Sequence, residues 1–106
     1  MDMQLKRGLL DVCVLAAIKE KDSYGYRILK DMEPYLTLSE STLYPILRRL
    51  ESAGMLTVRI TEHNGRLRKY YHITPAGTER LQAFESEWAE LDAIHKFIVG
   101  EEPAHE

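Results

Sequence analysis

Hydroxyl and arginine side chains are concentrated between residues 39 and 49, and basic and aromatic side chains follow between residues 64 and 70. Hydroxyl groups can donate hydrogen bonds to anionic oxygens, and arginine does so with a permanent positive charge. This chemistry suits the binding of phosphate groups. The residues assigned to it are Ser39, Ser41, Thr42, Tyr44, Arg48, Arg49, Asn64, Arg66, Arg68, Lys69 and Tyr70.

The remaining reactive residue types do not form a catalytic or metal-binding pattern. The four histidines lack metal-ligand spacing, and no glycine-rich phosphate loop follows a strand. The single cysteine, Cys13, lies among apolar residues with no neighbouring histidine. We therefore predict no enzyme activity, metal or cofactor. Cys13 is either a small apolar core residue or, if its helix lies between subunits, a thiol switch.

The net charge of −3 hides an uneven distribution along the chain. Residues 39–73 contain six Lys or Arg against three Glu, whereas residues 74–106 contain two against eight Asp or Glu. The distribution of charge decides the choice of partner more than its sum does. The basic middle segment is therefore compatible with an anionic partner.

The longest apolar run, Leu9 to Ile18, is too short to span a bilayer, which needs about 18 residues or more. It includes Asp11, and no small-residue cleavage site follows it. One cysteine cannot form an intramolecular disulfide, which fits a reducing compartment. We expect a cytoplasmic protein of one small domain with no membrane partner.

The stretch TLYPILRRLESAG, residues 42–54, predicts a helix with a proline close to its start. Ser39 or Ser41 can cap this helix, so Pro45 falls near the end of the first turn, where it removes few helical hydrogen bonds. Gly54 can end the helix in a left-handed conformation. The predicted buried stripe is Ile46, Leu47, Leu50 and Ala53.

Two alternating segments, LTVRITE and LRKYYHI, flank HNGR and predict a β-hairpin with Asn64-Gly65 as a type I′ turn. In that register Leu56 faces Ile73, and Val58 faces Tyr71. The remaining expected pairs are Ile60 with Lys69 and Glu62 with Leu67. One face should be apolar and the other should carry Thr57, Arg59, Arg68, Tyr70 and His72.

The first 34 residues predict two helices. The first, residues 3–19, has two apolar stripes, and a small domain can cover only one of them. We infer that a second subunit covers the other; the alternative is a central helix wrapped by its own chain. The second helix should be capped by Asp22 or Ser23 and ended by Pro34.

Thr74 and Pro75 predict the start of a last helix whose apolar residues recur at spacings of three and four. Such a seam requires another helix, which a symmetry-related subunit can provide. The residues predicted to form the dimer interface are Leu5, Leu9, Val12, Leu81, Phe84, Trp88, Leu91, His95 and Ile98.

Three helices followed by a two-stranded hairpin predict a winged helix-turn-helix, a mainly α fold with a small β-hairpin. In this arrangement the third helix enters the major groove of double-stranded DNA, and the hairpin contacts the backbone or minor groove. We divide the chain into a DNA-binding domain, residues 1–74, a C-terminal dimerisation helix, residues 75–100, and a frayed acidic tail, residues 101–106.

The segments TLYPILRRLESAG and GRLRKYYHITPAG resemble the signature of PadR-family transcriptional regulators, and SYGYRIL, residues 23–29, is similar to the family's Gly-Tyr motif. The resemblance runs from about residue 5 to residue 98. It implies a homodimeric winged-helix repressor that binds a palindromic operator. It assigns DNA contacts to Tyr44, to the approach at residues 39–42, to Lys69-Tyr70 and to Arg66.

The chain resembles the small branch of the family, which has a single C-terminal helix. In members of that branch that sense drugs or other planar aromatics, a tryptophan on this helix lines a flat cavity at the dimer centre. Trp88 stands at that place, and Asp92 could pair with a cationic ligand. The expected ligand site also includes Leu9 and Val12, although bulky residues nearby could fill it. Alternatively, Trp88 only anchors the dimer.

A different class of function remains open, because winged helices can also serve as protein-interaction adaptors without DNA binding. The cationic hairpin favours an anionic partner. DNA affinity that falls steeply with salt would distinguish a DNA-binding regulator from an adaptor.

Overall fold

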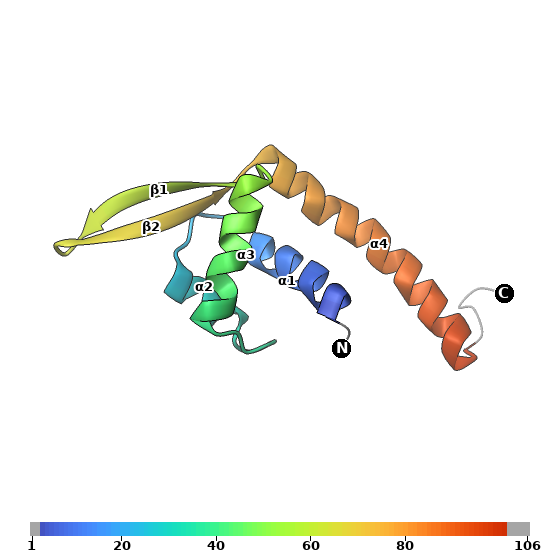
Figure 1. Ribbon diagram of the computed structural model, residues 1–106. Helices are drawn as coiled ribbons and strands as arrows, with labels where there is room; N and C mark the ends of the chain where they lie inside the picture. The colour runs from blue at the N-terminus through green and yellow to red at the C-terminus, as the bar shows by residue number, and fades with distance from the viewer. Residues whose placement is uncertain (1–2, 102–106) are drawn as a thin grey trace.

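A computed structural model of the chain describes residues 3–101 (Figure 1). Three helices form the centre, and a β-hairpin and a long helix leave it in opposite directions. In chain order the elements are α1 (Met3–Ala17), α2 (Gly25–Met32), α3 (Glu40–Ser52), β1 (Leu56–His63), β2 (Arg66–Ile73) and α4 (Pro75–Val99). The radius of gyration is 16.5 Å, whereas a compact domain of 100 residues has about 13 Å. Much of the chain therefore lies outside the central core.

The core is formed where α1, α2 and α3 pack against one another and against the base of the hairpin. One of the two apolar stripes of α1 is buried at Leu10 and Val14, and Ile18, which directly follows the helix, is buried beside them. In α3 the predicted stripe is buried at Ile46, Leu47 and Leu50, whereas Ala53 is exposed as the C-cap residue. Both helices therefore face the core through the apolar spacing seen in the sequence.

The ends of α3 follow from local side-chain and backbone chemistry. Ser39 rather than Ser41 is the N-cap, and its hydroxyl accepts a hydrogen bond from the Thr42 N–H at 3.3 Å. At the other end Gly54 has a φ of 76°, and the Met55 N–H reaches the Leu50 carbonyl at 2.9 Å. This is a Schellman ending, which requires the left-handed residue that glycine supplies.

The hairpin has the predicted register, with Leu56 opposite Ile73, Val58 opposite Tyr71 and Ile60 opposite Lys69. Asn64 and Gly65 have φ values of 53° and 77°, as a type I′ turn requires. Because opposite residues share a face, Lys69 lies on the same face as Ile60, away from Arg68. The basic residues of the hairpin are thus divided between its two faces.

Two boundaries near residues 17–25 differ from the predictions. Helix α1 ends at Ala17 rather than at residue 19, and α2 begins at Gly25 with no side-chain cap. The backbone of Ser23 instead pairs with Tyr71 of β2, with N···O distances of 3.2 and 2.8 Å. Asp22 directs its carboxylate to Arg59 and His72. Tertiary pairing with β2 therefore replaced the local cap that the sequence suggested.

Helix α4 begins as predicted, with the Thr74 hydroxyl accepting a hydrogen bond from the Gly77 N–H at 3.2 Å. Gly77 is buried so close to the Met55 carbonyl that a larger residue would collide with it. The first turns of α4 pack on α1, so Val12 is buried and Leu81 and Phe84 are half-buried. This partly matches the alternative in which the chain covers its own first helix.

Beyond these turns α4 extends away from the core (Figure 1). Its apolar side chains there are exposed, namely Trp88, Leu91, Ile94, Phe97, Ile98 and Val99. The expected acidic tail lies outside the described residues from residue 102 onward. Within residues 3–101, no helix has both the length and the apolar character needed to cross a bilayer.

Candidate nucleic-acid interface

The N-terminal end of α3 carries a cluster of exposed hydroxyl groups. The Ser39 Oγ lies 3.0 Å from the Ser41 Oγ and 3.1 Å from the Thr42 Oγ1. The first N–H groups of a helix point out of its end, where they favour anions. The predicted residues Ser39, Ser41 and Thr42 are therefore brought together at the exposed N-terminal end of α3.

Tyr44 lies across the start of α2, and the packing there explains Gly25. A Cβ atom at Gly25 would collide with the phenol ring of Tyr44, so only glycine lets the ring lie this close. The ring borders a groove of about 480 Å³ between α2, α3 and β2. The groove is lined by Tyr24, Gly25, Tyr26, Tyr44, Arg68, Lys69 and Tyr71. The two predicted DNA contacts Tyr44 and Lys69 thus share one groove.

The adjacent arginines of α3 have different surroundings. Arg49 forms an ion pair with Asp11 of α1. Arg48 is exposed, and among the described residues it has no hydrogen-bond or ion-pair partner. Arg48 lies one helical turn after Tyr44 on α3, and its charge opposes the rise in the pKa of Tyr71 that burial causes. Arg48 is therefore the free arginine beside Tyr44, and Arg49 is held by α1.

The hairpin, residues 56–73, is called the wing below. Asn64 and Arg66 lie exposed at its tip, and Lys69 is exposed on the face shared with Ile60. Arg68 is half-buried against Tyr24 and Tyr70 on the opposite face. Lys69 and Tyr71 therefore share one face of the wing, whereas Arg68 borders the groove with its guanidinium stacked on Tyr24.

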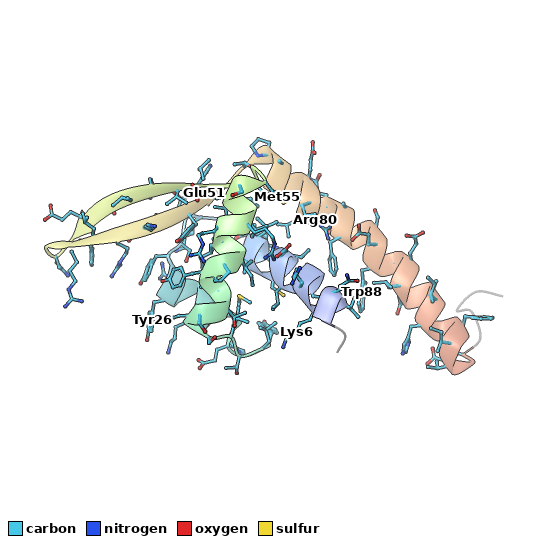
Figure 2. The ribbon with its side chains drawn as sticks, in the orientation of Figure 1. Lys6, Tyr26, Glu51, Met55, Arg80 and Trp88 are labelled. Carbon is cyan, nitrogen blue, oxygen red and sulfur yellow. The ribbon has the colours of Figure 1, made fainter. Side chains whose placement is uncertain are left out.

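The sequence analysis did not include Tyr26 and Lys30 among the candidate contacts. Tyr26 borders the same groove and is 62% exposed, and the Lys30 Nζ lies 5.9 Å from the centre of its ring. The SYGYRIL motif contains Tyr26, and helical spacing places Lys30 one turn later. These residues widen the polar and aromatic surface on the α2 side of the groove. The label in Figure 2 marks Tyr26 on α2, beside the lower part of α3.

The residues of the expected ligand site are spread over α1 and α4. Val12 borders a cavity of about 540 Å³ with Leu81 and Phe84, whereas Trp88 lies further along α4 and is 56% exposed. The Phe84 and Trp88 rings are 6.4 Å apart. Asp92 forms an ion pair with Lys96 at 3.3 Å. Figure 2 shows Trp88 on the side of α4 toward α1.

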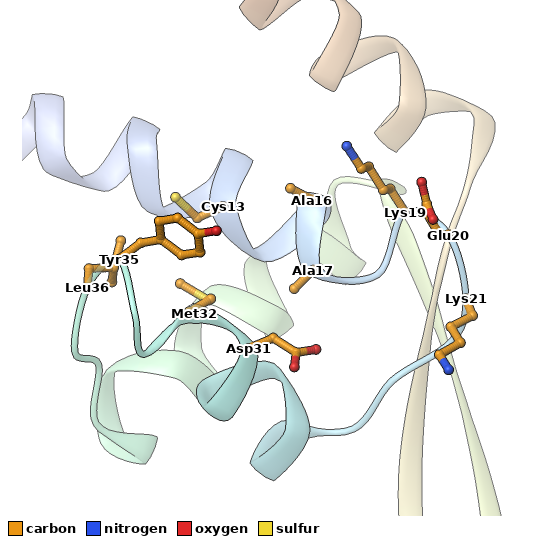
Figure 3. Close-up of a pocket in the computed structure, with 10 residues that line it drawn as sticks. All are labelled: Cys13, Ala16, Ala17, Lys19, Glu20, Lys21, Asp31, Met32, Tyr35 and Leu36. Carbon is orange, nitrogen blue, oxygen red and sulfur yellow. The ribbon is translucent and has the colours of Figure 1, made fainter.

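Cys13 borders a separate cavity of about 550 Å³ between α1 and the end of α2 (Figure 3). Met32, Tyr35 and Leu36 line the α2 side of this cavity. Burial raises the pKa of the Cys13 thiol, which disfavours the reactive thiolate. This environment supports the reading of Cys13 as a small apolar residue. Among the described residues, no three His, Cys, Asp or Glu side chains gather into a metal site.

A helix that exposes hydroxyls and a free arginine beside a two-stranded wing is the arrangement of a winged helix-turn-helix DNA-binding protein. Residues 14–83 match the transcriptional regulator PadR-like family. The chain belongs to this family of transcriptional regulators. Membership makes it a DNA-binding regulator, and the family is not one of enzymes.

Similar proteins cover nearly the whole chain. A Streptococcus mutans protein of known crystal structure is 38% identical, with a TM-score of 0.78, over 93% of this chain and 94% of that one. A PadR-like transcription factor from Bacteroides fragilis is 32% identical, with a TM-score of 0.80, over 90% and 94% of the two chains. An uncharacterized protein of Lysinibacillus sphaericus is 37% identical over 93 residues, which are 83% of this chain and 85% of that one. These similarities confirm the predicted fold class.

Proposed function

We propose that the protein is a homodimeric repressor that binds a palindromic operator in double-stranded DNA. The observation that carries the proposal is the groove beside α3, which Tyr44 and Lys69 both line, with the free Arg48 one helical turn after Tyr44. Hydroxyls at the start of α3 would contact phosphates or base edges in the major groove, and the wing would follow the backbone. Two copies related by a two-fold axis would read the two halves of a palindrome.

The free end of α4 supports the dimer. Contiguous exposed apolar surface of this kind marks an interaction site. Trp88 and Leu91 are 56% and 43% exposed, and Ile98 is 71% exposed. The predicted His95 lies on the same side of the helix, and Leu5 and Leu9 extend the apolar surface onto α1. Val12 is only 7% exposed in the single chain, so it contributes little to this surface.

Fluorescence anisotropy with a labelled fragment from upstream of the protein's own gene tests the DNA-binding part of the proposal. We expect tighter binding to this fragment than to scrambled DNA at two salt concentrations. Tyr44→Ala should weaken specific binding about tenfold, because each subunit loses one uncharged contact. Lys69→Ala removes one cationic phosphate contact from each subunit and should weaken binding about sixtyfold at 0.1 M salt. Neither change should alter the dimer, because both residues lie on the wing side of the molecule.

The control for these variants is their oligomeric state, measured by light scattering. Loss of the dimer in either variant would mean that the residue belongs to a subunit interface. Absence of DNA binding by the unchanged protein, even at low salt, would contradict the repressor and favour the adaptor.

We further propose that a planar aromatic ligand between the two subunits releases the operator. The support is the exposed indole of Trp88 beside Phe84, which could stack on a flat molecule in a dimer. The ligand should quench the fluorescence of Trp88, the only tryptophan, and release DNA. Trp88→Ala should keep DNA binding but lose the ligand response. Release of DNA by the same ligand concentration in Trp88→Ala would contradict this site.

A further inference from the structure

The face of the wing that points away from Lys69 carries a row of stacked arginine and tyrosine side chains. The Arg68 guanidinium lies 4.1 Å from the centre of the Tyr24 ring, and the Arg59 guanidinium lies 4.8 Å from that of Tyr70. The two tyrosine rings meet edge to face at 5.5 Å. Arg68 also donates a hydrogen bond to the Tyr70 hydroxyl at 3.4 Å. Each arginine is thus engaged by a ring of this row.

The segment before α2 connects this row to the body of the molecule. Ser23 pairs through its backbone with Tyr71 in an isolated antiparallel bridge, so residues 22–24 lie beside β2. Antiparallel pairing at Ser23 places Asp22 opposite His72 and Tyr24 opposite Tyr70. The Asp22 carboxylate accepts from His72 at 2.8 Å and pairs with Arg59 at 3.2 Å. Ion pairs and stacked rings therefore join three segments of the chain on one face.

We propose that Arg68 and Arg59 are positioning residues, which hold the wing at a fixed angle to α2 through Tyr24, Tyr70 and Asp22. Arg68 borders the groove, but its guanidinium is engaged by Tyr24 and Tyr70 and does not bind a DNA phosphate. These five residues are called the wing clamp. This inference rests on the proposed DNA binding. It replaces the role that the sequence analysis gave to Arg68.

The outer part of the wing needs such a clamp because the core holds only its base. Leu56 and Tyr71 are buried, whereas Ile60 is 58% and Leu67 is 79% exposed. A two-stranded hairpin without such support is marginally stable. Lys69 lies in this outer part, so its distance from Tyr44 across the groove depends on the angle of the wing.

The chemistry of the wing clamp favours arginine over lysine. A guanidinium is flat and can lie on a ring while donating a hydrogen bond, whereas an ammonium is a compact and strongly hydrated charge. The hydrogen bond from Arg68 to Tyr70 raises the pKa of Arg68, although arginine is charged at any physiological pH. The hydrogen bond from His72 lowers the pKa of Asp22, which likewise favours its charged form.

The first test uses amide hydrogen exchange in the DNA-free protein, with Tyr24→Leu, Arg68→Gln and Arg68→Lys. We expect the amide exchange rate of residues 66–73 to rise about three- to tenfold in all three variants. Loss of one stacked arginine–tyrosine pair should increase local opening of the wing by a factor of this size. Tyr35→Leu is the matched control, since Tyr35 is 87% exposed and lies outside the clamp. Unchanged exchange in Tyr24→Leu, or an equal rise in Tyr35→Leu, would overturn the clamp.

The second test measures operator affinity against salt concentration. Tyr24→Leu and Arg68→Gln should weaken binding about three- to tenfold, because the loosened wing must be ordered when DNA binds. The salt slope should stay unchanged, because the number of phosphate contacts is the same. Arg66→Gln, at the tip of the same strand, should lower the slope by about 1.8 per dimer. A similar fall of the slope in Arg68→Gln, restored in Arg68→Lys, would overturn the inference. If the unchanged protein binds no operator, the proposed function fails. The hydrogen-exchange test still shows whether the wing clamp holds the wing in place.

Discussion

Leu91→Asp is expected to convert the protein into a monomer and to lower its operator affinity at least about a hundredfold. Leu91 is 43% exposed in the single chain and lies in the apolar seam of α4. Burial of a leucine side chain contributes about 1.5–3 kcal/mol, and a two-fold interface contains the residue twice. The substitution also places two carboxylates in an apolar contact, and each costs several kcal/mol to desolvate.

The loss of operator affinity follows from the loss of the link between the two DNA-binding units. In a dimer the second unit binds its half-site at a high effective concentration, which increases overall affinity by about 10²–10⁴. A monomer binds one half-site without this gain. The helices of the core should stay folded, because the start of α4 packs on α1 well before residue 91.

Ala93→Asp is the matched control for this prediction. At 100° per residue, Ala93 lies on the side of α4 opposite the seam, and it is exposed. Sedimentation equilibrium should give a monomer for Leu91→Asp and a dimer for Ala93→Asp, with the same helical circular dichroism at low concentration. A stable Leu91→Asp dimer would show that the subunits meet through another surface.

Local chemistry explains which parts of the fold were predictable. The type I′ turn at Asn64-Gly65 fixes the register of both strands, so every predicted pair of the hairpin was right. Ser39 and Gly54 define the ends of α3 through hydrogen bonds within a few residues of themselves. Such signals depend on neighbours in the sequence, and tertiary packing did not override them.

Contacts between distant segments explain what was missed. Ser23 pairs with Tyr71, and Asp22 pairs with Arg59 and His72, across separations that no local pattern reveals. The sequence predicted the cationic and aromatic face of the wing, but not that residues 22–24 would cover it. The prediction that Asp22 or Ser23 caps α2 was wrong for the same reason.

The gathering of candidate residues on one surface was predictable from the sequence, whereas the contacts of single side chains were less so. Tyr44 and Lys69 were among the residues selected from the sequence, and both line one groove. The choice between Arg48 and Arg49 stayed open, because helical spacing places both near the exposed face. The ion pair of Arg49 with Asp11, 38 residues away, distinguishes them and could not be read from the sequence.

The two arginines should therefore differ sharply when each is replaced by alanine. In Arg48→Ala, two phosphate contacts per dimer are lost, which should reduce the salt slope by about 1.8 and the affinity about sixtyfold at 0.1 M salt. Arg49→Ala should leave the slope unchanged. Its partly exposed ion pair contributes at most about 1 kcal/mol to the free energy of unfolding.

Titrations of the operator at several salt concentrations, together with urea unfolding of both variants, measure these differences. Arg48→Lys serves as a control, because it keeps the charge and should retain most of the salt slope. If Arg49→Ala lowers the slope as much as Arg48→Ala does, the ion pair with Asp11 must open on DNA. In that case Asp11→Asn would strengthen operator binding, because it frees Arg49 to contact DNA. If Arg49 serves only the stability of the fold, Asp11→Asn should leave operator binding unchanged.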